Sequence, residues 1–450
     1  MSTYEHLTKR RIGVVGLGER TGVSLVKYLC SQGAHVVVYD QKTENELKDQ
    51  LNALTEFNFE FELGTERPIR ILSSEFLLLS PGVPFSKPFL VKAREKGIPT
   101  WSEVEFAGKR LSSPLLAITG TNGKSTTTSL LAHLLKTSGK KVFVGGNLGT
   151  PLIEALGQAY DFIVAEISSF QLEAVETFHP KVAALLNIFP NHLDRHGDMK
   201  TYVACKEKLF AKMEGEDLAI LNQENSWCQN LAKKIKSSCW QFSLCSERAD
   251  VYVKGEEVFA KGKSIASLKG YQLFGKHNLE NALAALSMAF ALGCSINSLE
   301  KGIQTFTALP HRLKWIATYQ GVRFINDSKS TTPEAAICAI QSFDAPTIYI
   351  AGGRPKGFAF SDLARAAERS VKHAIFFGEA ASQMGQAFNQ IPHHLFRTLG
   401  EALEKAIEIA QDGDVVLFSP ANSSFDQYKS YEHRGDHFRS LLESFGKDQT

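Results

Sequence analysis

A short apolar run that leads directly into a glycine-rich polar loop restricts the fold of this chain more than any other segment. Residues 115–118 are apolar, and residues 119–126 read Thr-Gly-Thr-Asn-Gly-Lys-Ser-Thr before a helical pattern that continues to Leu135. In α/β domains, a strand that turns through glycines into a helix presents backbone N–H groups and the helix N-terminus to phosphate. We therefore predict an α/β fold that contains a nucleotide-binding loop.

The side chains of this loop suit a nucleoside triphosphate and a divalent cation. Lys124 would neutralise the β- and γ-phosphates, and the hydroxyl of Ser125 would bind Mg²⁺. The spacing departs from the common G-x-x-x-x-G-K-[ST] pattern because Ile118 occupies the first glycine position. A Gly-Lys-Ser turn without a nucleotide is the alternative. The predicted ligands are ATP and Mg²⁺, and the predicted ATP contacts in the loop are Gly120, Thr121, Asn122, Gly123, Lys124, Ser125 and Thr126.

Short β-branched runs alternate with helical patterns along the whole chain, which predicts mostly parallel sheets. At roughly 150 residues per domain, a chain of 450 residues suggests about three domains. Residues 251–253 and 258–260 alternate in polarity beside glycines, so we expect small hairpins there. Residues 99–105 are expected to be a connector. The predicted domains are residues 1–99, 100–308 and 309–450.

Composition excludes several classes of protein. Fifty basic residues nearly balance 48 acidic ones, which argues against a general dependence on nucleic acid. No apolar stretch approaches the ~18 residues that a membrane helix needs. From the N-terminal segment we expect no secretory signal, and the seven cysteines show no Cys-x-x-Cys spacing. We expect a cytoplasmic monomer that binds neither membranes nor nucleic acid.

Two residues are candidate metal ligands. Glu166 ends an apolar run, and the carboxyl end of a parallel strand is where ligands bind in such sheets. Carboxylate oxygens suit Mg²⁺ beside phosphates, although a structural salt bridge is the alternative. His192 lies in Asn-His-Leu-Asp-Arg-His and could bind a metal through one ring nitrogen, or be a solvated loop residue.

Residues 119–126 resemble the ATP loop of the Mur ligases and of folylpolyglutamate synthase, which add amino acids to carboxylates through acyl phosphates. The resemblance implies that Glu166 and His192 bind Mg²⁺ and that Ser168 and Gln171 lie near the substrate. It also identifies Lys206, in Ala-Cys-Lys-Glu-Lys, as a lysine carbamylated by carbon dioxide. The carbamate would then be an oxygen ligand, with two magnesium sites expected. From the residues alone, Lys206 would be a surface lysine on a basic helix.

Further polar clusters suit the rest of the nucleotide. Asn278 and Asn281 are three residues apart on one helix face, and their amides could hydrogen-bond adenine, while Asn278 could also cap the helix. Arg312 suits phosphate, because a guanidinium forms two charge-assisted hydrogen bonds with it. Asp327 suits the ribose hydroxyls and Lys329 the transferred phosphate, with a plain turn as the alternative.

Three motifs resemble the D-glutamate-adding Mur ligases, and they occur in the expected order over nearly the whole chain. They are Asn-Asp-Ser-Lys-Ser-Thr from residue 326, Gly-Gly-Arg-Pro-Lys-Gly from residue 352, and residues 419–428. The resemblance implies that the chain joins D-glutamate to UDP-N-acetylmuramoyl-L-alanine in peptidoglycan precursor synthesis. Lys356 would pair with the side-chain carboxylate. The predicted D-glutamate contacts are Thr331, Lys356, Ser424, Phe425 and Tyr431.

The first region contains Gly-Leu-Gly-Glu-Arg-Thr-Gly from residue 16, and Asp40 ends the next apolar run. By itself this is an imperfect dinucleotide fingerprint, because the third glycine lies one residue beyond the G-x-G-x-x-G position. The resemblance implies Rossmann-like N- and C-terminal domains around a central P-loop ATPase-like domain, with the UDP group in the first. The predicted UDP-substrate contacts are Gly18, Thr21, Asp40, Gly82, Asn147, Ser168, Gln171 and His192.

Three other functions remain open. The glycine-rich turn of the first region would also serve a nicotinamide-dependent oxidoreductase. A nucleotide-gated binding protein without chemistry is possible in principle, but the combination of Lys124, Glu166, His192, Lys206 and Lys329 argues against it. Within the ligases, a member that adds L-alanine, a diamino acid or glutamate to folate is the nearest rival.

Overall fold

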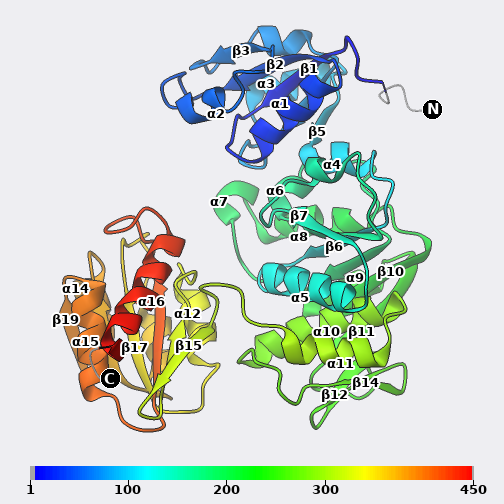
Figure 1. The fold of residues 1–450 in the computed structure, drawn as a ribbon. Coiled ribbons are helices and arrows are strands. Elements are labelled where there is room, and N and C mark those ends of the chain that lie inside the picture. The colour runs from blue at the N-terminus through cyan, green and yellow to red at the C-terminus, as the bar shows by residue number, and fades with distance from the viewer. Residues whose placement is uncertain (1–5, 448–450) are drawn as a thin grey trace. The chain divides into compact units, whose positions relative to one another are not determined.

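The computed structural model describes residues 6–447, which divide into two compact units (Figure 1). One unit extends to Lys269 and also includes Glu280–Gln304, and the other comprises Gly270–Leu279 and the chain from Thr305 onward. None of the described helices combines the length and the apolar character needed to span a bilayer.

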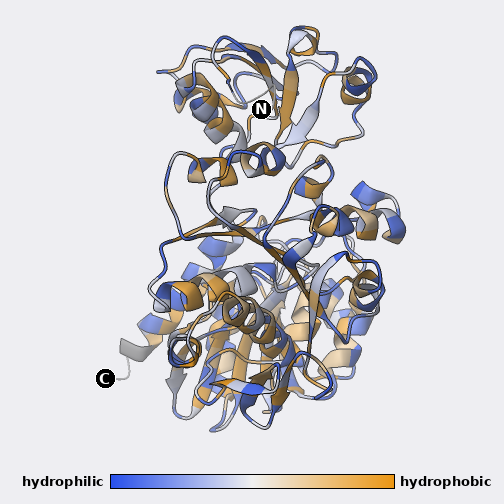
Figure 2. Ribbon diagram, turned by 90° about the vertical axis from the view of Figure 1, so that its right-hand side faces the viewer, coloured by the Kyte–Doolittle hydropathy of each residue, from blue (hydrophilic) through white to orange (hydrophobic). Residues whose placement is uncertain are grey.

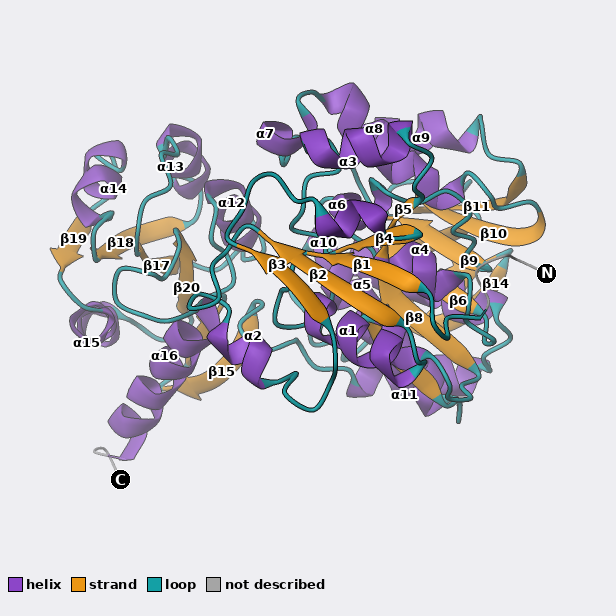
Figure 3. Cartoon of the chain, turned by 90° about the horizontal axis from the view of Figure 1, so that it is seen from above, coloured by secondary structure: helices purple, strands orange, loops and turns teal. Residues whose placement is uncertain are grey.

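The first sheet is parallel and has the order β3-β2-β1-β4-β5. Strands β3, β2 and β1 lie side by side in Figure 3. The chain order reverses between β1 and β4, which creates the crevice in which open α/β sheets bind ligands. Its elements are β1 (Arg11–Val15), α1 (Thr21–Ser31), β2 (His35–Asp40), α2 (Lys48–Asn52), β3 (Glu60–Leu63), η1 (Arg70–Ser73), β4 (Phe76–Leu79), α3 (Pro88–Glu95) and β5 (Thr100–Ser102).

The second sheet has nine strands in the order β14-β13-β12-β11-β10-β9-β6-β8-β7. Its strands from β6 to β11 pair in parallel, and β6 lies centrally with every residue buried. This burial on both faces explains the continuous apolar runs in the sequence. The strands are β6 (Leu115–Thr119), β7 (Val142–Gly146), β8 (Phe162–Glu166), β9 (Val182–Leu185), β10 (Gly215–Asn222) and β11 (Ser237–Ser243).

The hairpins predicted at residues 251–260 are confirmed. Strands β12 (Val251–Lys254), β13 (Glu257–Ala260) and β14 (Lys263–Ser267) pair antiparallel and extend the second sheet at one edge. The helices of this region are α4 (Glu103–Gly108), α5 (Lys124–Thr137), η2 (Leu152–Ala155), α6 (Ser169–Leu172), α7 (Leu193–His196), α8 (Met199–Glu207), η3 (Lys208–Phe210), α9 (Ser226–Ala232), α10 (Lys276–Ala291) and α11 (Ile296–Thr305).

The third sheet, in the second unit, has the order β15-β16-β20-β17-β18-β19. Only its edge strand β15 is antiparallel, and its central strands β20 and β17 are buried along their whole length. Many strands of the molecule are coloured as hydrophobic in Figure 2. The elements are β15 (Lys314–Tyr319), β16 (Val322–Asn326), α12 (Pro333–Ile340), β17 (Thr347–Gly352), α13 (Ser361–Ala367), β18 (Val371–Phe377), α14 (Ala381–Ala387), β19 (His393–Phe396), α15 (Leu399–Ile409), β20 (Val415–Ala421) and α16 (Tyr431–Lys447).

The segment expected to be a connector at residues 99–105 is instead regular structure, so that prediction is wrong. Strand β5 pairs with β4, and α4 begins immediately after it with Ser102 as the N-cap, whose hydroxyl accepts a hydrogen bond from the Glu105 N–H. The three sheets occupy residues 11–102, 115–267 and 314–421. The domain boundaries drawn after residues 99 and 308 stay predictions.

Candidate active site

The predicted strand–turn–helix is present as β6, residues 120–123 and α5. Gly123 has a φ of +84°, and a Cβ atom there would lie 2.1 Å from the Oδ1 atom of Asn281. The same oxygen accepts a hydrogen bond from the hydroxyl of Thr127 at 3.2 Å. Asn281 is therefore packed against the phosphate loop, and glycine is required at position 123 for this contact.

Asn187, at the carboxyl edge of the same sheet, holds the loop in place. Its Oδ1 atom accepts a hydrogen bond from the Asn122 N–H at 2.9 Å, and its carbonyl accepts one from the Thr121 N–H at 2.9 Å. The hydroxyl of Thr121 lies 3.0 Å from that of Tyr202, on α8. Asn187 and Tyr202 were not among the predicted site residues. For Asn187 a signal was available, because it directly follows the apolar run at residues 182–186, and polar residues at the carboxyl ends of parallel strands lie where ligands bind.

Two lysines from different helices, Lys124 at the start of α5 and Lys206 on α8, donate hydrogen bonds to the loop. The Nζ atom of Lys124 donates to the carbonyls of Gly120 (3.0 Å) and Thr121 (2.7 Å). The Nζ atom of Lys206 donates to the carbonyl of Gly120 at 2.9 Å and the hydroxyl of Thr119 at 3.3 Å. Lys206 is only 1% exposed, so the alternative of a surface lysine is wrong. Burial, reinforced by the charge of Lys124, lowers the pKa of Lys206 well below its usual value.

Glu166 is the last residue of β8, and only one of its two carboxylate oxygens accepts a hydrogen bond from the described residues. Its Oε1 atom accepts a hydrogen bond from the amide of Asn147 at 2.6 Å. Its Oε2 atom is buried and accepts no hydrogen bond from any residue that the structure describes. An orphaned carboxylate oxygen beside a phosphate loop suits a cation. The following residues Ser168 and Gln171 form a capping box that starts α6.

His192 stands immediately before α7 in the left-handed region, with a φ of +54°. Its ring centroid lies 4.8 Å from that of Phe170. Burial lowers the pKa of His192, and the charges of Lys124 and Lys206 lower it further against an opposing effect of Asp194. A neutral imidazole can donate its lone pair to a metal. Within residues 6–447, however, no three His, Cys, Asp or Glu side chains form a metal-binding group.

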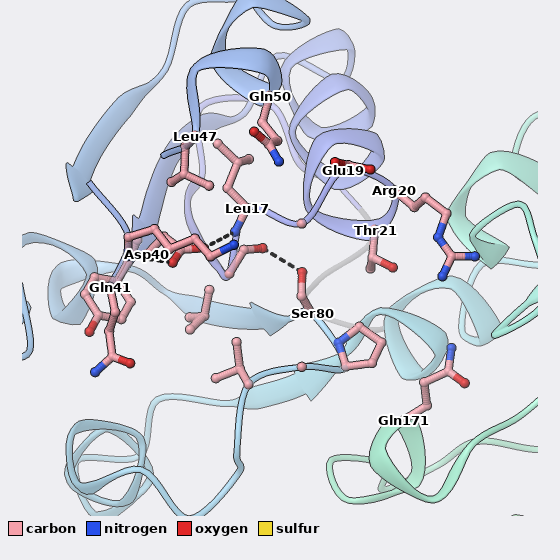
Figure 4. Close-up of a pocket in the computed structure, with 18 of the residues that line it drawn as sticks. Leu17, Glu19, Arg20, Thr21, Asp40, Gln41, Leu47, Gln50, Ser80 and Gln171 are labelled. Carbon is pink, nitrogen blue, oxygen red and sulfur yellow. Dashed lines mark hydrogen bonds between the residues drawn. The ribbon is translucent and has the colours of Figure 1, made fainter. Parts of the chain in front are cut away.

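A pocket of about 780 Å³ opens at the crevice of the first sheet (Figure 4). Arg20, Thr21 and Gln171 lie on one side of it and Asp40 on the other. Six of the eight predicted UDP-substrate contacts line this pocket, whereas Ser168 and His192 are not among its lining residues. The six are Gly18, Thr21, Asp40, Gly82, Asn147 and Gln171.

Hydrogen bonds and close packing hold the glycine-rich turn at residues 16–22. Both carboxylate oxygens of Asp40 accept backbone hydrogen bonds, from Leu17 at 2.8 Å and from Lys42 at 3.0 Å. A Cβ atom at Gly22 would lie 2.5 Å from the carbonyl oxygen of Gly16, so this third glycine permits α1 to pack closely. The guanidinium of Arg20 donates to the carbonyl of Gly149 at 3.1 Å. Arg20 was not a predicted contact.

In the second unit, the predicted nucleotide residues lie at the carboxyl end of β16. Asp327 is buried, and its two oxygens accept hydrogen bonds from the Leu313 N–H (3.1 Å) and the Ser419 hydroxyl (2.8 Å). Burial raises the pKa of Asp327 to about 7, although Arg312 opposes the shift. The Nζ atom of Lys329 donates to the hydroxyl of Tyr431 at 2.9 Å. Asn278, also in this unit, donates its amide to the carbonyl of Phe274 at 2.7 Å.

A residue that the sequence analysis missed, Arg434, is hydrogen-bonded to loops that neighbour several of the predicted D-glutamate contacts. Arg434, on α16, is completely buried and donates hydrogen bonds to the carbonyls of Ser328 (2.9 Å), Asn422 (3.1 Å) and Ser423 (3.2 Å). Burial, followed by the charge of Arg434, lowers the pKa of Lys356. The other predicted contacts differ in exposure: Thr331 is half-buried, Ser424 buried and Phe425 62% exposed.

Three family models match successive parts of the chain. They are described as the Mur ligase MurD-like N-terminal domain (residues 10–102), the Mur ligase middle domain (residues 118–289) and the Mur ligase glutamate ligase domain (residues 311–422). The UDP-N-acetylmuramoylalanine--D-glutamate ligase of Caldanaerobacter subterraneus subsp. tengcongensis is 38% identical over 97% of this chain and 98% of its own length. The chain belongs to the Mur ligase family.

Other Mur ligases agree with this assignment. The UDP-N-acetylmuramoylalanine--D-glutamate ligase of Koribacter versatilis is 39% identical over 98% of both chains. Among solved structures, MurF from Acinetobacter baumannii covers 96% of this chain and 93% of its own at a TM-score of 0.63 and 19% identity. UDP-N-acetylmuramate-alanine ligase MurC from Thermotoga maritima covers 96% and 99% at a TM-score of 0.61 and 20% identity. These two show the shared fold.

The family match also bears on the oxidoreductase alternative. In this Mur ligase, the glycine-rich turn at residues 16–22 falls inside the MurD-like N-terminal domain. The turn belongs to a Mur ligase domain, and the match gives no support to a nicotinamide dinucleotide site.

Proposed function

We propose that this chain is a cytoplasmic, monomeric, ATP-dependent ligase that joins D-glutamate to UDP-N-acetylmuramoyl-L-alanine during peptidoglycan precursor synthesis. The observation that carries the proposal is 38–39% identity, over nearly the full length of both chains, to relatives named UDP-N-acetylmuramoylalanine--D-glutamate ligase. The match of residues 10–102 to a MurD-like N-terminal domain points in the same direction.

The phosphate loop would bind the ATP phosphates. Residues 120–126 would provide backbone N–H groups, and the N-terminus of α5 favours negative charge. The Nζ atom of Lys124 donates to two loop carbonyls in this structure. When ATP binds, the γ-phosphate would replace these carbonyls as the hydrogen-bond acceptor. Asn281 touches the loop and would lie near the nucleotide, with Asn278, Arg312 and Asp327 as the contacts from the second unit.

The residues around this loop fit Mg²⁺. The observation that supports this fit is the Oε2 atom of Glu166, which is buried and accepts no hydrogen bond from the described residues, as expected of an oxygen that binds a cation. Ser125, Glu166 and His192 would hold the ions, together with Lys206 as a carbamate. When bound, Mg²⁺ would offset the charge of the phosphates. The depressed pKa of Lys206 makes its amine available for carbamylation, because only the neutral amine reacts with carbon dioxide.

The pocket at the first sheet would take the UDP group. Its volume of about 780 Å³ lies in the range of ligand sites, and it is lined by loops that follow β1 and β4. Asn147, a lining residue, also donates to Glu166, so the pocket is connected to the candidate metal ligand. The substrate carboxylate would extend from the pocket toward the phosphate loop, past Ser168 and His192.

D-glutamate would bind to the second unit. Lys356 would pair with its side-chain carboxylate, and Thr331, Ser424, Phe425 and Tyr431 would surround it. Lys329, which contacts Tyr431, would face the transferred phosphate. The low pKa of Lys356 follows from partial burial and from Arg434.

The reaction has two steps. A carboxylate oxygen of UDP-N-acetylmuramoyl-L-alanine attacks the γ-phosphorus, forming a C–O–P linkage while ADP leaves. The neutral amine of D-glutamate then attacks the acyl carbon, an amide forms, and phosphate departs with loss of the amine proton. Lys124 and Lys329 would offset negative charge on the transferred phosphoryl group. Exclusion of water protects the acyl phosphate from hydrolysis.

Phosphate release from ATP tests the proposal. The protein is incubated with UDP-N-acetylmuramoyl-L-alanine and, in parallel, D-glutamate, L-glutamate or L-alanine. We expect release and amide product with D-glutamate only, and none with Lys124→Ala. Product with L-alanine alone, or undiminished turnover by Lys124→Ala, would refute the assignment.

A further inference from the structure

An ion pair connects the UDP-substrate pocket to the segment that carries His192. Arg195, on α7, donates to the carbonyl of Gly82 at 3.2 Å and that of Val83 at 2.9 Å. Both acceptors follow β4 and line the pocket. The same guanidinium makes two hydrogen bonds to the carboxylate of Glu173, at 2.9 and 2.7 Å. The guanidinium of Arg195 therefore donates hydrogen bonds both to carbonyls of the pocket loop and to the carboxylate of Glu173.

Glu173, just after α6, is fixed from several directions. Its Oε2 atom also accepts a hydrogen bond from the Phe85 N–H at 3.3 Å, in the same pocket loop. Its carbonyl accepts one from the Nζ atom of Lys208 at 2.7 Å. The side chains of Glu173 and Arg195 are each only 14% exposed. A bidentate pair that is this buried is stronger and better defined than an exposed ion pair.

Aromatic contacts continue from this pair to the phosphate loop. The guanidinium carbon of Arg195 lies 4.7 Å above the ring of Phe170, whose centroid is 4.8 Å from that of His192 and 5.7 Å from that of His196. The ring of His196 is 5.3 Å from that of Tyr202, whose hydroxyl contacts Thr121. The chain of contacts from Gly82 to the phosphate loop is unbroken.

We propose that Arg195 and Glu173 are positioning residues that couple occupancy of the UDP-substrate pocket to occupancy of the phosphate loop. A ligand that orders the loop at residues 82–85 also orders α7, His192 and, through Tyr202, Thr121. The second ligand then pays less of the ordering cost, so each ligand tightens the binding of the other. The inference rests on the proposed function, because it takes the pocket ligand to be the UDP-sugar substrate.

The test measures binding rather than turnover. The dissociation constant of UDP-N-acetylmuramoyl-L-alanine is determined by calorimetry with and without saturating Mg²⁺ and β,γ-methylene-ATP. In the wild type, we expect nucleotide to tighten substrate binding at least about fivefold. In Arg195→Lys and in Glu173→Gln the ratio falls to about one, while the affinity for nucleotide alone stays within about twofold.

Arg94→Lys is the matched control. Arg94 donates to the carbonyl of Phe85 at 3.0 Å, so it contacts the same pocket loop from α3. Within residues 6–447 its side chain contacts Phe85 and makes no hydrogen bond or ion pair with α7, so its variant should keep the wild-type ratio even if substrate binding weakens. In the double variant of Arg195 and Glu173, the loss of coupling should be no greater than in either single variant.

The failures can be told apart. A wild type that binds nucleotide but not the UDP substrate refutes the proposed function. A wild type that binds both without coupling, or an Arg195→Lys protein that keeps the wild-type ratio, overturns this inference alone. The isosteric Glu173→Gln keeps an acceptor for the Phe85 N–H, so it provides the answer if Arg195→Lys does not fold.

Discussion

The Nζ atoms of Lys124 and Lys206 both donate to one acceptor, the carbonyl oxygen of Gly120, at 3.0 and 2.9 Å. Two cations that share one carbonyl repel each other, and only Lys206 is nearly inaccessible to water. The charge is therefore less stable on Lys206, and its pKa falls well below the usual value. The shared carbonyl therefore favours the neutral amine at Lys206.

Replacing Lys206 should abolish ligation without removing nucleotide binding. Lys206→Met cannot form a carbamate, so we expect kcat to fall by about 10² or more, while β,γ-methylene-ATP still binds through Lys124. Phosphate release and calorimetry measure the two effects. Lys200→Met, at an exposed position on the same helix, should behave as the wild type. Full activity of Lys206→Met would exclude a role for the carbamate.

Glu166→Gln should raise the Mg²⁺ concentration needed for half-maximal activity. The glutamine oxygen can still interact with the Asn147 amide, but the neutral group loses the charge that its orphaned oxygen offers to a cation. We expect a rise of about tenfold or more, because about 1.4 kcal/mol of lost cation affinity corresponds to that factor. An unchanged Mg²⁺ titration would show that Glu166 is only a partner of Asn147.

Glu103 should make the stability of the protein depend on pH. It is 1% exposed; its Oε1 atom accepts a hydrogen bond from the Ile153 N–H at 2.6 Å, and its Oε2 atom has no partner among the described residues. Burial raises its pKa to about 7. The folded state thus binds more protons than the unfolded state between about pH 4.3 and about 7, and the free energy of unfolding falls as pH rises through this window.

Glu103→Gln removes this ionisation and keeps the acceptor for Ile153. The free energy of unfolding of this variant relative to wild type should therefore rise from about pH 4.3 to about 7 and then level off, with a total gain of about 4 kcal/mol at most. Melting temperatures measured across this pH range report the change. Glu95→Gln, at an exposed position on α3, is the control and should follow the wild type. If the difference in melting temperature between wild type and Glu103→Gln is the same at every pH, the raised pKa of Glu103 is contradicted.

The parts of the fold that could be predicted are those where local pattern and burial agree. The runs at 115–118 and 162–165 are apolar because their strands are covered on both faces, and the alternation beside glycines at 251–260 identified the hairpins. Strand β5 was missed, because three residues carry too little periodicity to distinguish a strand from a linker. Its identity depends on pairing with β4.

Burial of individual charged residues could not be predicted. Lys206 lies between Lys200 and Lys208 in the sequence, which suggests a solvated helix, yet its Nζ atom donates to a carbonyl of the phosphate loop and the side chain is buried. Arg434 follows Glu432 and His433 in the sequence, and it is buried because the loops at the ends of three strands converge on it. Such positions are decided by tertiary packing, which leaves no local signal. The resemblance to the Mur ligases implied a role for Lys206, which stays a prediction, but it did not indicate that the side chain is buried.

Arg434→Lys should weaken D-glutamate binding. The arginine is fully buried, and its three nitrogens donate to a hydroxyl and four carbonyls in the loops at residues 328, 352 and 422–423. Burial lowers its pKa to about 10, so it remains charged at neutral pH. A lysine offers a single nitrogen and would leave several buried carbonyls without a donor, which costs about 1–3 kcal/mol each.

Those loops lead to Lys356 and Ser424, so their displacement should raise the KM for D-glutamate by about tenfold or more, since about 1.4 kcal/mol corresponds to that factor. The KM for UDP-N-acetylmuramoyl-L-alanine should change little, because its pocket lies in the other unit. Arg439→Lys is the control, since Arg439 is on the same helix but pairs with Asp436 at the surface. Equal increases in both KM values would mean that Arg434 supports overall stability and has no particular effect on the amino-acid site.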